Sequence, residues 1–352
     1  MNSTMIEQSQ SAFVQLGKLM CHLGAAHPWP GFECGITEAE YEEFEELIKV
    51  VPQHNRWFSE ENIRMAIGNL GCMLEEEGLR AWRESYPEAP EVPKRIGLIM
   101  AGNIPLVGFH DVLCVVLAGH KAAIKLSSDD KLLLPAITRL LEKFDPSLQG
   151  KIEFSEGKLT NYDAVIATGS NNTARYFDYY FKHVPLLVRK NRNSVAVLTG
   201  EESPEELARL GHDIFDFFGL GCRNVTKVYI PRDFVLDRFF EAIYPFHAVG
   251  DHNKYANNYD YHKAIWLLNG EEILDNGFIL LKEDPNLSSP TGTLYYERYD
   301  QLSDVTTKLK EQQEDIQCIV GRDYLPFGQA QKPGLADYAD GVDTMEWVLR
   351  SV

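Results

Sequence analysis

The sequence predicts an α/β fold in which a doubly wound parallel sheet and a second α/β domain follow an N-terminal helical region. Short apolar runs alternate with amphipathic helical segments after residue 94, and a proline-rich stretch, 86–93, precedes them. Alternation of this kind favours a parallel sheet with helices on both faces. Polar residues follow several of the apolar runs, where such a sheet binds its ligands.

Length and charge narrow the class of protein. A chain of 352 residues is too long for one simple core and fits two domains. Its net charge of -18 repels phosphate, which argues against nonspecific partners such as nucleic acid or an anionic membrane. The N-terminus does not resemble a secretion signal, and no apolar run approaches the roughly 20 residues that span a bilayer. We therefore expect a cytoplasmic protein.

The cysteine pattern indicates reduced thiols. The six cysteines are scattered and include no Cys-x-x-Cys pair, so neither a disulfide framework nor a thiolate zinc site is expected. They are Cys21, Cys34, Cys72, Cys114, Cys222 and Cys318.

The first 93 residues form the expected helical region. Thr37 precedes Glu38-Ala-Glu40 and Ser59 precedes Glu60-Glu-Asn62, two patterns that are typical of helix N-caps. Prolines in 86–93 remove backbone donors and restrict their neighbours. We place the boundary of a separate helical subdomain there.

The expected first α/β domain covers residues 94–203. Its strands are predicted at 95–100, 122–125, 151–154 and 164–167, and its helices at 105–117, 131–144 and 171–183. A strand at 194–198 leads into a second domain, 204–325, and the C-terminal segment 326–352 can return to the first domain.

Cys222 is the strongest candidate for a nucleophile. It follows Gly219-Leu-Gly221 and precedes a β-branched run, so the backbone can bend closely around an open thiol. Asn103 follows a predicted strand and offers an amide donor of the kind that stabilises an oxyanion in acyl transfer. Each residue alone has a simpler explanation, since most single cysteines fill a core.

The order of five motifs resembles the aldehyde dehydrogenase superfamily from residue 95 onward. The motifs are Ala-Gly-Asn103-Ile-Pro, Ala-Ile-Lys125-Leu-Ser-Ser128, Ala-Thr-Gly169-Ser170, Gly-Leu-Gly-Cys222 and Leu-Pro-Phe327-Gly328. Within that superfamily, the stretches Asn55–Asn62 and Pro326–Ala330 look like the bacterial acyl-CoA reductases of the LuxC type. The resemblance implies an aldehyde-dehydrogenase-like fold with a cofactor domain (94–203) and a catalytic domain (204–325).

The resemblance also implies a reaction: reduction of a fatty acyl-CoA thioester to the aldehyde with NADPH. In this comparison Cys222 matches the nucleophile. Asn103 matches the oxyanion donor, acting with the backbone N–H of Cys222. Arg223 is an adjacent candidate for activating the thiol.

Cofactor contacts are implied at two strand ends. Lys125 matches the residue that contacts the adenosine ribose, and the turn Thr168-Gly169-Ser170 matches the one beside the pyrophosphate or nicotinamide. A lysine followed by Ser127 and Ser128 offers a cation and hydroxyls to a ribose or its 2′-phosphate, which favours NADPH over NADH.

Two departures from the superfamily pattern bear on the chemistry. Where oxidising members carry Glu-Leu-Gly-Gly, with the glutamate that activates water, this chain reads Val188-Arg-Lys-Asn-Arg192. Loss of that base suits CoA-dependent reduction, and the basic residues Arg189, Lys190 and Arg192 either meet CoA phosphates or form a solvated turn. Ser288 stands where a ribose-binding glutamate is expected.

Other interpretations stay open. An acyl-phosphate reductase needs the same cysteine and no hydrolytic base, and a non-catalytic scaffold of this fold explains the missing glutamates. A homo-oligomer and a partner that delivers acyl groups or consumes the aldehyde are both compatible with the sequence.

Histidines and tyrosines gather between residues 247 and 262. His247, Asp251, His252 and His262 lie close in sequence, but no two of these histidines are four residues apart, so we expect no metal. Tyr255, Tyr259 and Tyr261 either line an acyl tunnel or pack ordinarily.

Overall fold

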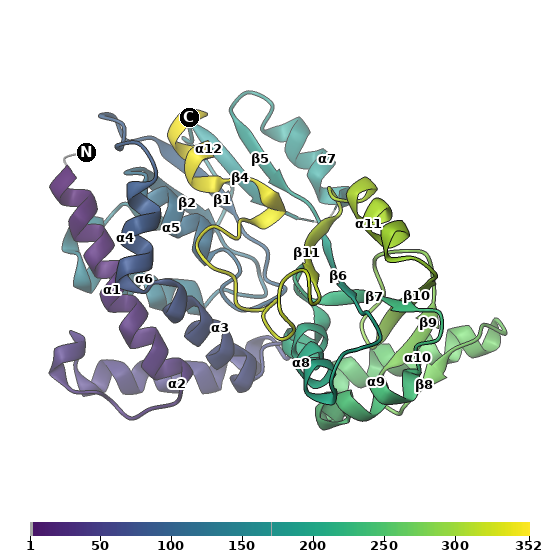
Figure 1. Ribbon diagram of the computed structural model, residues 1–352. Helices are drawn as coiled ribbons and strands as arrows, with labels where there is room; N and C mark the ends of the chain where they lie inside the picture. The colour runs from purple at the N-terminus through teal and green to yellow at the C-terminus, as the bar shows by residue number, and fades with distance from the viewer. Residues whose placement is uncertain (1–2, 170) are drawn as a thin grey trace. The chain divides into compact units, whose positions relative to one another are not determined.

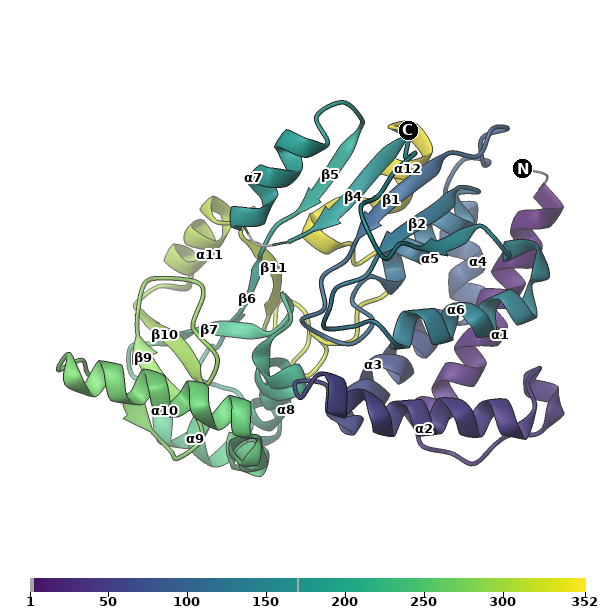
Figure 2. The same ribbon diagram turned by 180° about the vertical axis from the view of Figure 1, so that it is seen from behind.

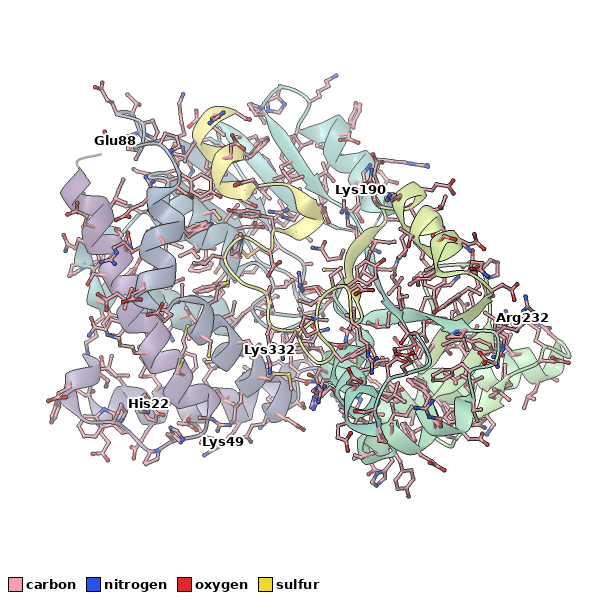
Figure 3. All side chains as sticks on the ribbon, viewed as in Figure 1. His22, Lys49, Glu88, Lys190, Arg232 and Lys332 are labelled. Atoms are coloured by element: carbon pink, nitrogen blue, oxygen red, sulfur yellow. The ribbon has the colours of Figure 1, made fainter. Side chains whose placement is uncertain are left out.

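The computed structural model describes residues 3–169 and 171–352. The chain forms two compact units. The first comprises the residues up to Lys190 together with Pro333–Val352, and the second is Asn191–Lys332. Figure 3 labels Lys190 and Lys332, the last residues before each boundary.

The first unit begins with the expected helices. They are α1 (Ser3–Gly24), α2 (Glu38–His54), α3 (Glu60–Met73) and α4 (Glu76–Glu84), with the short 3-10 helix η1 (Phe32–Cys34) between α1 and α2. Both predicted caps are confirmed: Thr37 forms a reciprocal capping box with Glu40, and the Ser59 side chain accepts from the N–H of Asn62.

A five-stranded parallel sheet follows, in the order β3-β2-β1-β4-β5. Helices cover both of its faces, with α12 on one and α7 on the other (Figures 1 and 2), so the doubly wound prediction is confirmed. The strands are β1 (Arg95–Ile99), β2 (Lys121–Lys125), β3 (Ile152–Phe154), β4 (Ala164–Thr168) and β5 (Leu186–Arg189). The helices are α5 (Phe109–Leu117), α6 (Leu133–Phe144), η2 (Pro146–Leu148), α7 (Asn171–Tyr180), η5 (Ala339–Gly341) and α12 (Thr344–Arg350).

Two local predictions in this unit are wrong. Helix α5 begins at Phe109 rather than at 105, because Leu106 takes a left-handed conformation, with φ of 58°, that no α-helix continues through. Strand β5 was not predicted at all. It ends at Arg189, one of the three basic residues expected either to meet CoA phosphates or to form a solvated turn.

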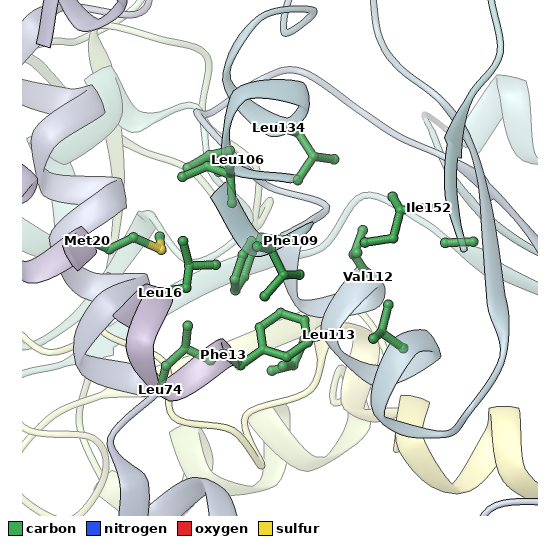
Figure 4. Close-up of a cluster of buried hydrophobic side chains, with 14 of the residues drawn as sticks. Phe13, Leu16, Met20, Leu74, Leu106, Phe109, Val112, Leu113, Leu134 and Ile152 are labelled. Carbon is green, nitrogen blue, oxygen red and sulfur yellow. The ribbon is translucent and has the colours of Figure 1, made fainter. Parts of the chain in front are cut away.

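The N-terminal helices share one hydrophobic core with the sheet, which corrects the predicted subdomain boundary at 93. Phe13 and Leu16 of α1 are buried against the same cluster as Phe109 and Leu113 of α5 (Figure 4). The rings of Phe13 and Phe109 meet edge to face, with centroids 6.2 Å apart. Burial of this shared face removes apolar surface of α1 and of α5 from water together.

Arg189 holds the C-terminal segment onto the first sheet. Its side chain is only 4% exposed and forms an ion pair with Asp111 of α5 at 2.7 Å. Two further bonds reach the C-terminal segment, to the carbonyl of Ala339 at 2.8 Å and to Oγ1 of Thr344 at 2.6 Å. One guanidinium thus joins β5, α5 and α12, with donors that match a carboxylate and two single acceptors.

The second unit contains a six-stranded sheet in the order β11-β6-β7-β10-β9-β8, parallel except for the edge pair β8 and β9. Its strands are β6 (Asn193–Val197), β7 (Val225–Pro231), β8 (Leu274–Asp275), β9 (Leu280–Glu283), β10 (Thr293–Tyr299) and β11 (Ile316–Val320). Its helices are α8 (Pro204–Phe215), η3 (Asp216–Gly219), α9 (Leu236–Ile243), η4 (Tyr244–Asp251), α10 (Asn253–Leu268) and α11 (Leu302–Glu311).

The unit boundaries at 190 and 332 differ from the predicted 203 and 325. Strand β6 pairs with β7 and β11, so the residues from 191 onward belong to the second sheet rather than to the first. The assignment of a cofactor to one domain and of catalysis to the other stays a prediction.

Replacing Arg189 with alanine is expected to lower the free energy of unfolding by about 3–5 kcal/mol, because it removes the buried partner of Asp111 and leaves this carboxylate, only 13% exposed, unpaired. Urea unfolding of native protein and variant measures this loss. Arg232→Ala is the control, since Arg232 pairs with Asp300 at an exposed site and should cost no more than about 1 kcal/mol. Equal losses in the two variants would contradict the structural role of Arg189.

Candidate functional site

Three parallel strands of the first unit end at the same level. Ile99 of β1 lies in register with Lys125 of β2 and with Ala167 of β4. The connections that follow these strands therefore start side by side at one edge of the sheet, where α/β proteins bind their ligands. The structure brings together there the predicted residues Asn103, Lys125, Ser127, Ser128, Thr168 and Gly169.

The loops after β1 and β2 are packed against each other. A Cβ on Gly102 would lie 2.7 Å from Oγ of Ser127, so only glycine lets the two backbones approach this closely. Oγ of Ser127 also accepts the N–H of Asp129 at 3.3 Å. Ser127 thus shapes the turn, whereas Asn103, Lys125 and Ser128 are exposed.

A buried carboxylate sets the path of the Asn103 loop. Oδ2 of Asp130 accepts the N–H of Leu106, the left-handed residue, at 2.8 Å. Burial raises the pKa of Asp130 to about 6. Beside it, the amide of Asn55, at the end of α2, donates to the carbonyl of Asp129 at 3.2 Å. The N-terminal helices therefore support the loop that follows β2, an arrangement that sequence reasoning did not find.

Gly169 allows α7 to approach the end of β4. A Cβ at this position would lie 3.0 Å from the ring of Phe177 and 3.1 Å from Thr173. Its N–H donates to the carbonyl of Arg189 at 3.2 Å. The predicted contact Ser170 lies outside the described residues.

In the second unit, Cys222 lies partly buried in the turn that leads into β7. Asn224 organises this turn: its Oδ1 accepts the N–H of Gly221 at 2.8 Å, and its own N–H donates to the carbonyl of Gly221 at 3.0 Å. Its Nδ2 lies 3.2, 3.3 and 2.8 Å from the carbonyl oxygens of Asp213, Ile214 and Asp216. A fully buried asparagine thus joins the cysteine turn to the end of α8.

Ser194 contacts the other side of the same cysteine. Oγ of Ser194, on β6, donates to the carbonyl of Cys222 at 2.9 Å. It accepts the N–H of Cys318 at 3.2 Å and lies 3.1 Å from Sγ of that residue. Neither Ser194 nor Asn224 was predicted. In the sequence, each of them is only a polar residue at the start of an apolar strand. That pattern does not show which backbone groups the side chain binds.

Asp213 ties the Leu-Pro-Phe327-Gly328 motif to α8. Its carboxylate accepts the N–H groups of Gly328 at 2.6 Å and Ala330 at 2.8 Å, and burial raises its pKa to about 6. Nε of Arg223 donates to the carbonyl of Ala330 at 2.5 Å. The predicted activator Arg223 therefore uses this donor to hold the loop after β11.

The segment before the cysteine is strained. Phe217 and Phe218 have φ of 55° and 56°, in the left-handed region, which costs roughly 1–3 kcal/mol for each non-glycine residue. The ring of Phe218 stacks on His252 with centroids 4.2 Å apart and lies 6.4 Å from Tyr255. A cluster of packed aromatic rings thus begins four residues before Cys222.

The three tyrosines that either line an acyl tunnel or pack ordinarily differ in their burial. Tyr255 and Tyr259 are buried, and the hydroxyl of Tyr259 donates to Asp275 at 2.5 Å. Tyr261 is 60% exposed on the same helix. Tyr255 and Tyr259 are thus packed within the second unit, and a tunnel lined by the three tyrosines stays a prediction.

The predicted basic cluster is also divided. Arg189 is buried and bound to Asp111, and Nη1 of Arg192 donates to the carbonyl of Ile316 at 3.3 Å. Lys190 keeps an exposed side chain. Arg189 therefore belongs neither to a CoA phosphate site nor to a solvated turn, because its guanidinium is buried and bound to the protein itself. Ser288 is exposed between β9 and β10.

Across residues 3–169 and 171–352, no group of three histidine, cysteine or acidic side chains is arranged to hold a metal ion. Within the same ranges no helix combines the length and the apolar character needed to cross a membrane.

No protein-family model and no curated protein matches this chain. Solved structures do. Aldehyde dehydrogenase C from Pseudomonas syringae, a variant solved with NAD+ and octanal, is 12% identical with a TM-score of 0.60, over 90% of this chain and 75% of that one.

Two further structures give the same result. The aldehyde dehydrogenase KauB from Pseudomonas aeruginosa is 11% identical with a TM-score of 0.61, over 90% of this chain and 72% of that one. An aldehyde dehydrogenase from Brucella melitensis biovar abortus is 13% identical with a TM-score of 0.62, over 89% and 72%. The chain thus has an aldehyde-dehydrogenase-like fold, which confirms the predicted fold class.

The buried Asp130 carboxyl makes a prediction about pH. Because its pKa is raised to about 6 in the folded protein, the folded state binds its proton more tightly than the unfolded state, and stability falls as pH rises from about 4 through 6. Asp130→Asn removes this titration. The variant should gain about 2–3 kcal/mol relative to the native protein between pH 4 and 7.5, on top of any constant offset.

Urea unfolding at several pH values measures this gain. Asp129→Asn is the matched control, since its side chain is exposed beside the same loop. Parallel pH profiles for the native protein and Asp130→Asn would show that the Asp130 carboxyl does not titrate in this range.

Proposed function

We propose that the protein reduces an acyl-CoA thioester to the aldehyde with NADPH, through an acyl group carried on Cys222. One observation carries the proposal: a cysteine that is only partly buried and lies in a turn whose backbone is bound on both sides by buried polar groups. A cysteine that only filled a core would need neither the exposure nor the bound turn. The aldehyde-dehydrogenase-like fold supports an oxidoreductase acting at the aldehyde level.

The strand-end loops of the first unit fit a nicotinamide nucleotide. Lys125 and Ser128 offer an exposed cation and an exposed hydroxyl at the end of β2 and in the loop that follows it. Ribose hydroxyls and phosphates are the groups that such donors recognise. Bound there, the nucleotide supplies a hydride. The Pseudomonas syringae structure contains NAD+, which supports a nicotinamide nucleotide as the cofactor. The Lys125 cation favours NADPH, because it can pair with the 2′-phosphate.

The residues of this chain account for the acyl transfer. The Cys222 thiolate attacks the thioester carbonyl, and its own backbone N–H and the Asn103 amide stabilise the oxyanion that forms. The oxyanion collapses, the carbon–sulfur bond to CoA breaks, and CoA leaves as a thiolate that takes a proton. The acyl group then remains on Cys222 as a thioester.

Reduction completes the cycle on the same sulfur. Hydride addition to the acyl carbon gives a thiohemiacetal oxyanion on Cys222, which the same two donors stabilise. Its collapse breaks the bond between this carbon and the Cys222 sulfur, releases the aldehyde and returns the thiolate.

Arg189 supports reduction over hydrolysis. It stands in the stretch where the resemblance places a water-activating glutamate, and its guanidinium is bound to Asp111 and Thr344. A bound cation cannot take a proton from water, so the acyl group persists until the hydride arrives.

Oxidation of NADPH by a series of acyl-CoA thioesters tests the proposal. Cys222→Ala should abolish turnover, and Asn103→Ala should reduce kcat by roughly 10²-fold or more, the usual scale for an oxyanion donor. Cys72→Ala and Asn257→Ala, at exposed positions, are the matched controls and should keep native rates.

Acyl phosphates and NADH serve as competing substrates in the same assay. Turnover with acyl phosphate alone would replace the thioester by a phosphate-activated acyl group. Full activity of Cys222→Ala, or no turnover with either class of substrate, would overturn the proposal.

A further inference from the structure

We infer that Asn224 and Ser194 are positioning residues that fix the backbone on both sides of Cys222. The inference rests on the proposed role of Cys222 as the nucleophile. Both side chains are 0% exposed, so neither meets a substrate directly. They act instead through the two peptide groups that flank the cysteine.

Asn224 fixes the peptide group before the cysteine. The carbonyl of Gly221 accepts the backbone N–H of Asn224, and the N–H of Gly221 donates to its Oδ1. Across a planar trans peptide, the N–H of Cys222 points opposite to the carbonyl of Gly221. It therefore points away from Asn224, in a direction that the Asn224 contacts determine.

Ser194 fixes the peptide group after the cysteine, through its bond to the Cys222 carbonyl. A serine hydroxyl has one proton and two lone pairs. Because the proton is used on Cys222, the contact with Sγ of Cys318 has the thiol as donor, and the second lone pair takes the N–H of Cys318. The hydroxyl is then saturated and cannot rotate without losing a bond.

Fixing both peptide groups leaves the cysteine few degrees of freedom. The two soft dihedrals at Cys222 lie between these groups, so the direction of its Cβ is set and only rotation about χ1 remains. The same two groups aim the Cys222 N–H. Nucleophile and oxyanion donor are thus oriented together, as acyl transfer requires.

Asn224 is itself held by a rigid element. Its Nδ2 contacts carbonyl groups at the C-terminal end of α8 and just beyond it, which lack partners within the helix. Replacing Asn224 would therefore disturb α8 as well as the turn. Ser194→Ala removes one hydroxyl and is the cleaner variant, and Ser194→Thr restores the hydroxyl.

The experiment measures alkylation of Cys222 by iodoacetamide, peptide by peptide, relative to the exposed Cys72 of the same molecule. Ser194→Ala and Asn224→Ala should each slow Cys222 relative to Cys72 by about tenfold or more, the scale of a displaced reactive group. Ser194→Thr should recover most of the native ratio. Thr307→Ala is the control, since that exposed hydroxyl donates to the carbonyl of Ser303 within its own helix.

Turnover gives a second measurement. With an acyl-CoA, kcat of Ser194→Ala should fall by about tenfold while KM stays within about twofold, because substrate contacts are unchanged. An alkylation ratio in Ser194→Ala equal to or above the native value would overturn the inference, whether or not Asn224→Ala folds. Absence of turnover in the native protein would instead overturn the proposed function and leave the alkylation result to decide the positioning role.

Discussion

The carbonyl groups at the end of α8 are the constraint on which the cysteine turn depends. A helix ends with backbone acceptors that lack partners, and buried acceptors must find donors. Asn224 supplies these donors with its side-chain amide, and its carbonyl oxygen and backbone N–H then bind Gly221. The position of the helix end therefore determines, through Asn224, the position of the peptide group that precedes Cys222. Asp213, at the same helix end, fixes the loop that carries Gly328 by accepting the N–H of that glycine.

In the first unit, the loops that follow β1, β2 and β4 start at one edge of the sheet. Parallel strands in register place the loop starts level, and the glycines at 102 and 169 let neighbouring groups approach where a Cβ would collide. Asp130 accepts the N–H of Leu106, a residue in the left-handed conformation. This bond fixes the loop that carries Asn103, so α5 does not extend into it. These buried polar contacts cost solvation energy, which the shared core of α1 and α5 offsets.

Local sequence patterns predicted most of the helices and strands. Contacts between residues far apart in the sequence determine where α5 begins and which side chains hold the cysteine turn. The caps Thr37 and Ser59 act on neighbours three residues away, and alternating strands and helices can be recognised within a short window, so these predictions succeeded. The start of α5 depends on Asp130, far along the chain, and was missed. Ser194 and Asn224 act on Cys222 from β6 and from the turn itself, and no spacing rule connects a buried serine to a carbonyl 28 residues later. The predicted roles of Asn103, Lys125 and Cys222 stay predictions, and measurements of activity must test them.

The proposed reaction passes through an acyl group bound covalently to the sulfur of Cys222, and this acyl-enzyme can be trapped and weighed. The protein is incubated with an acyl-CoA in the absence of NADPH, digested, and the peptides are weighed by mass spectrometry. We expect the mass of one acyl group to be added to the peptide that carries Cys222, and free CoA to appear in equal amount. No adduct, or an adduct on another cysteine such as Cys318, would contradict it.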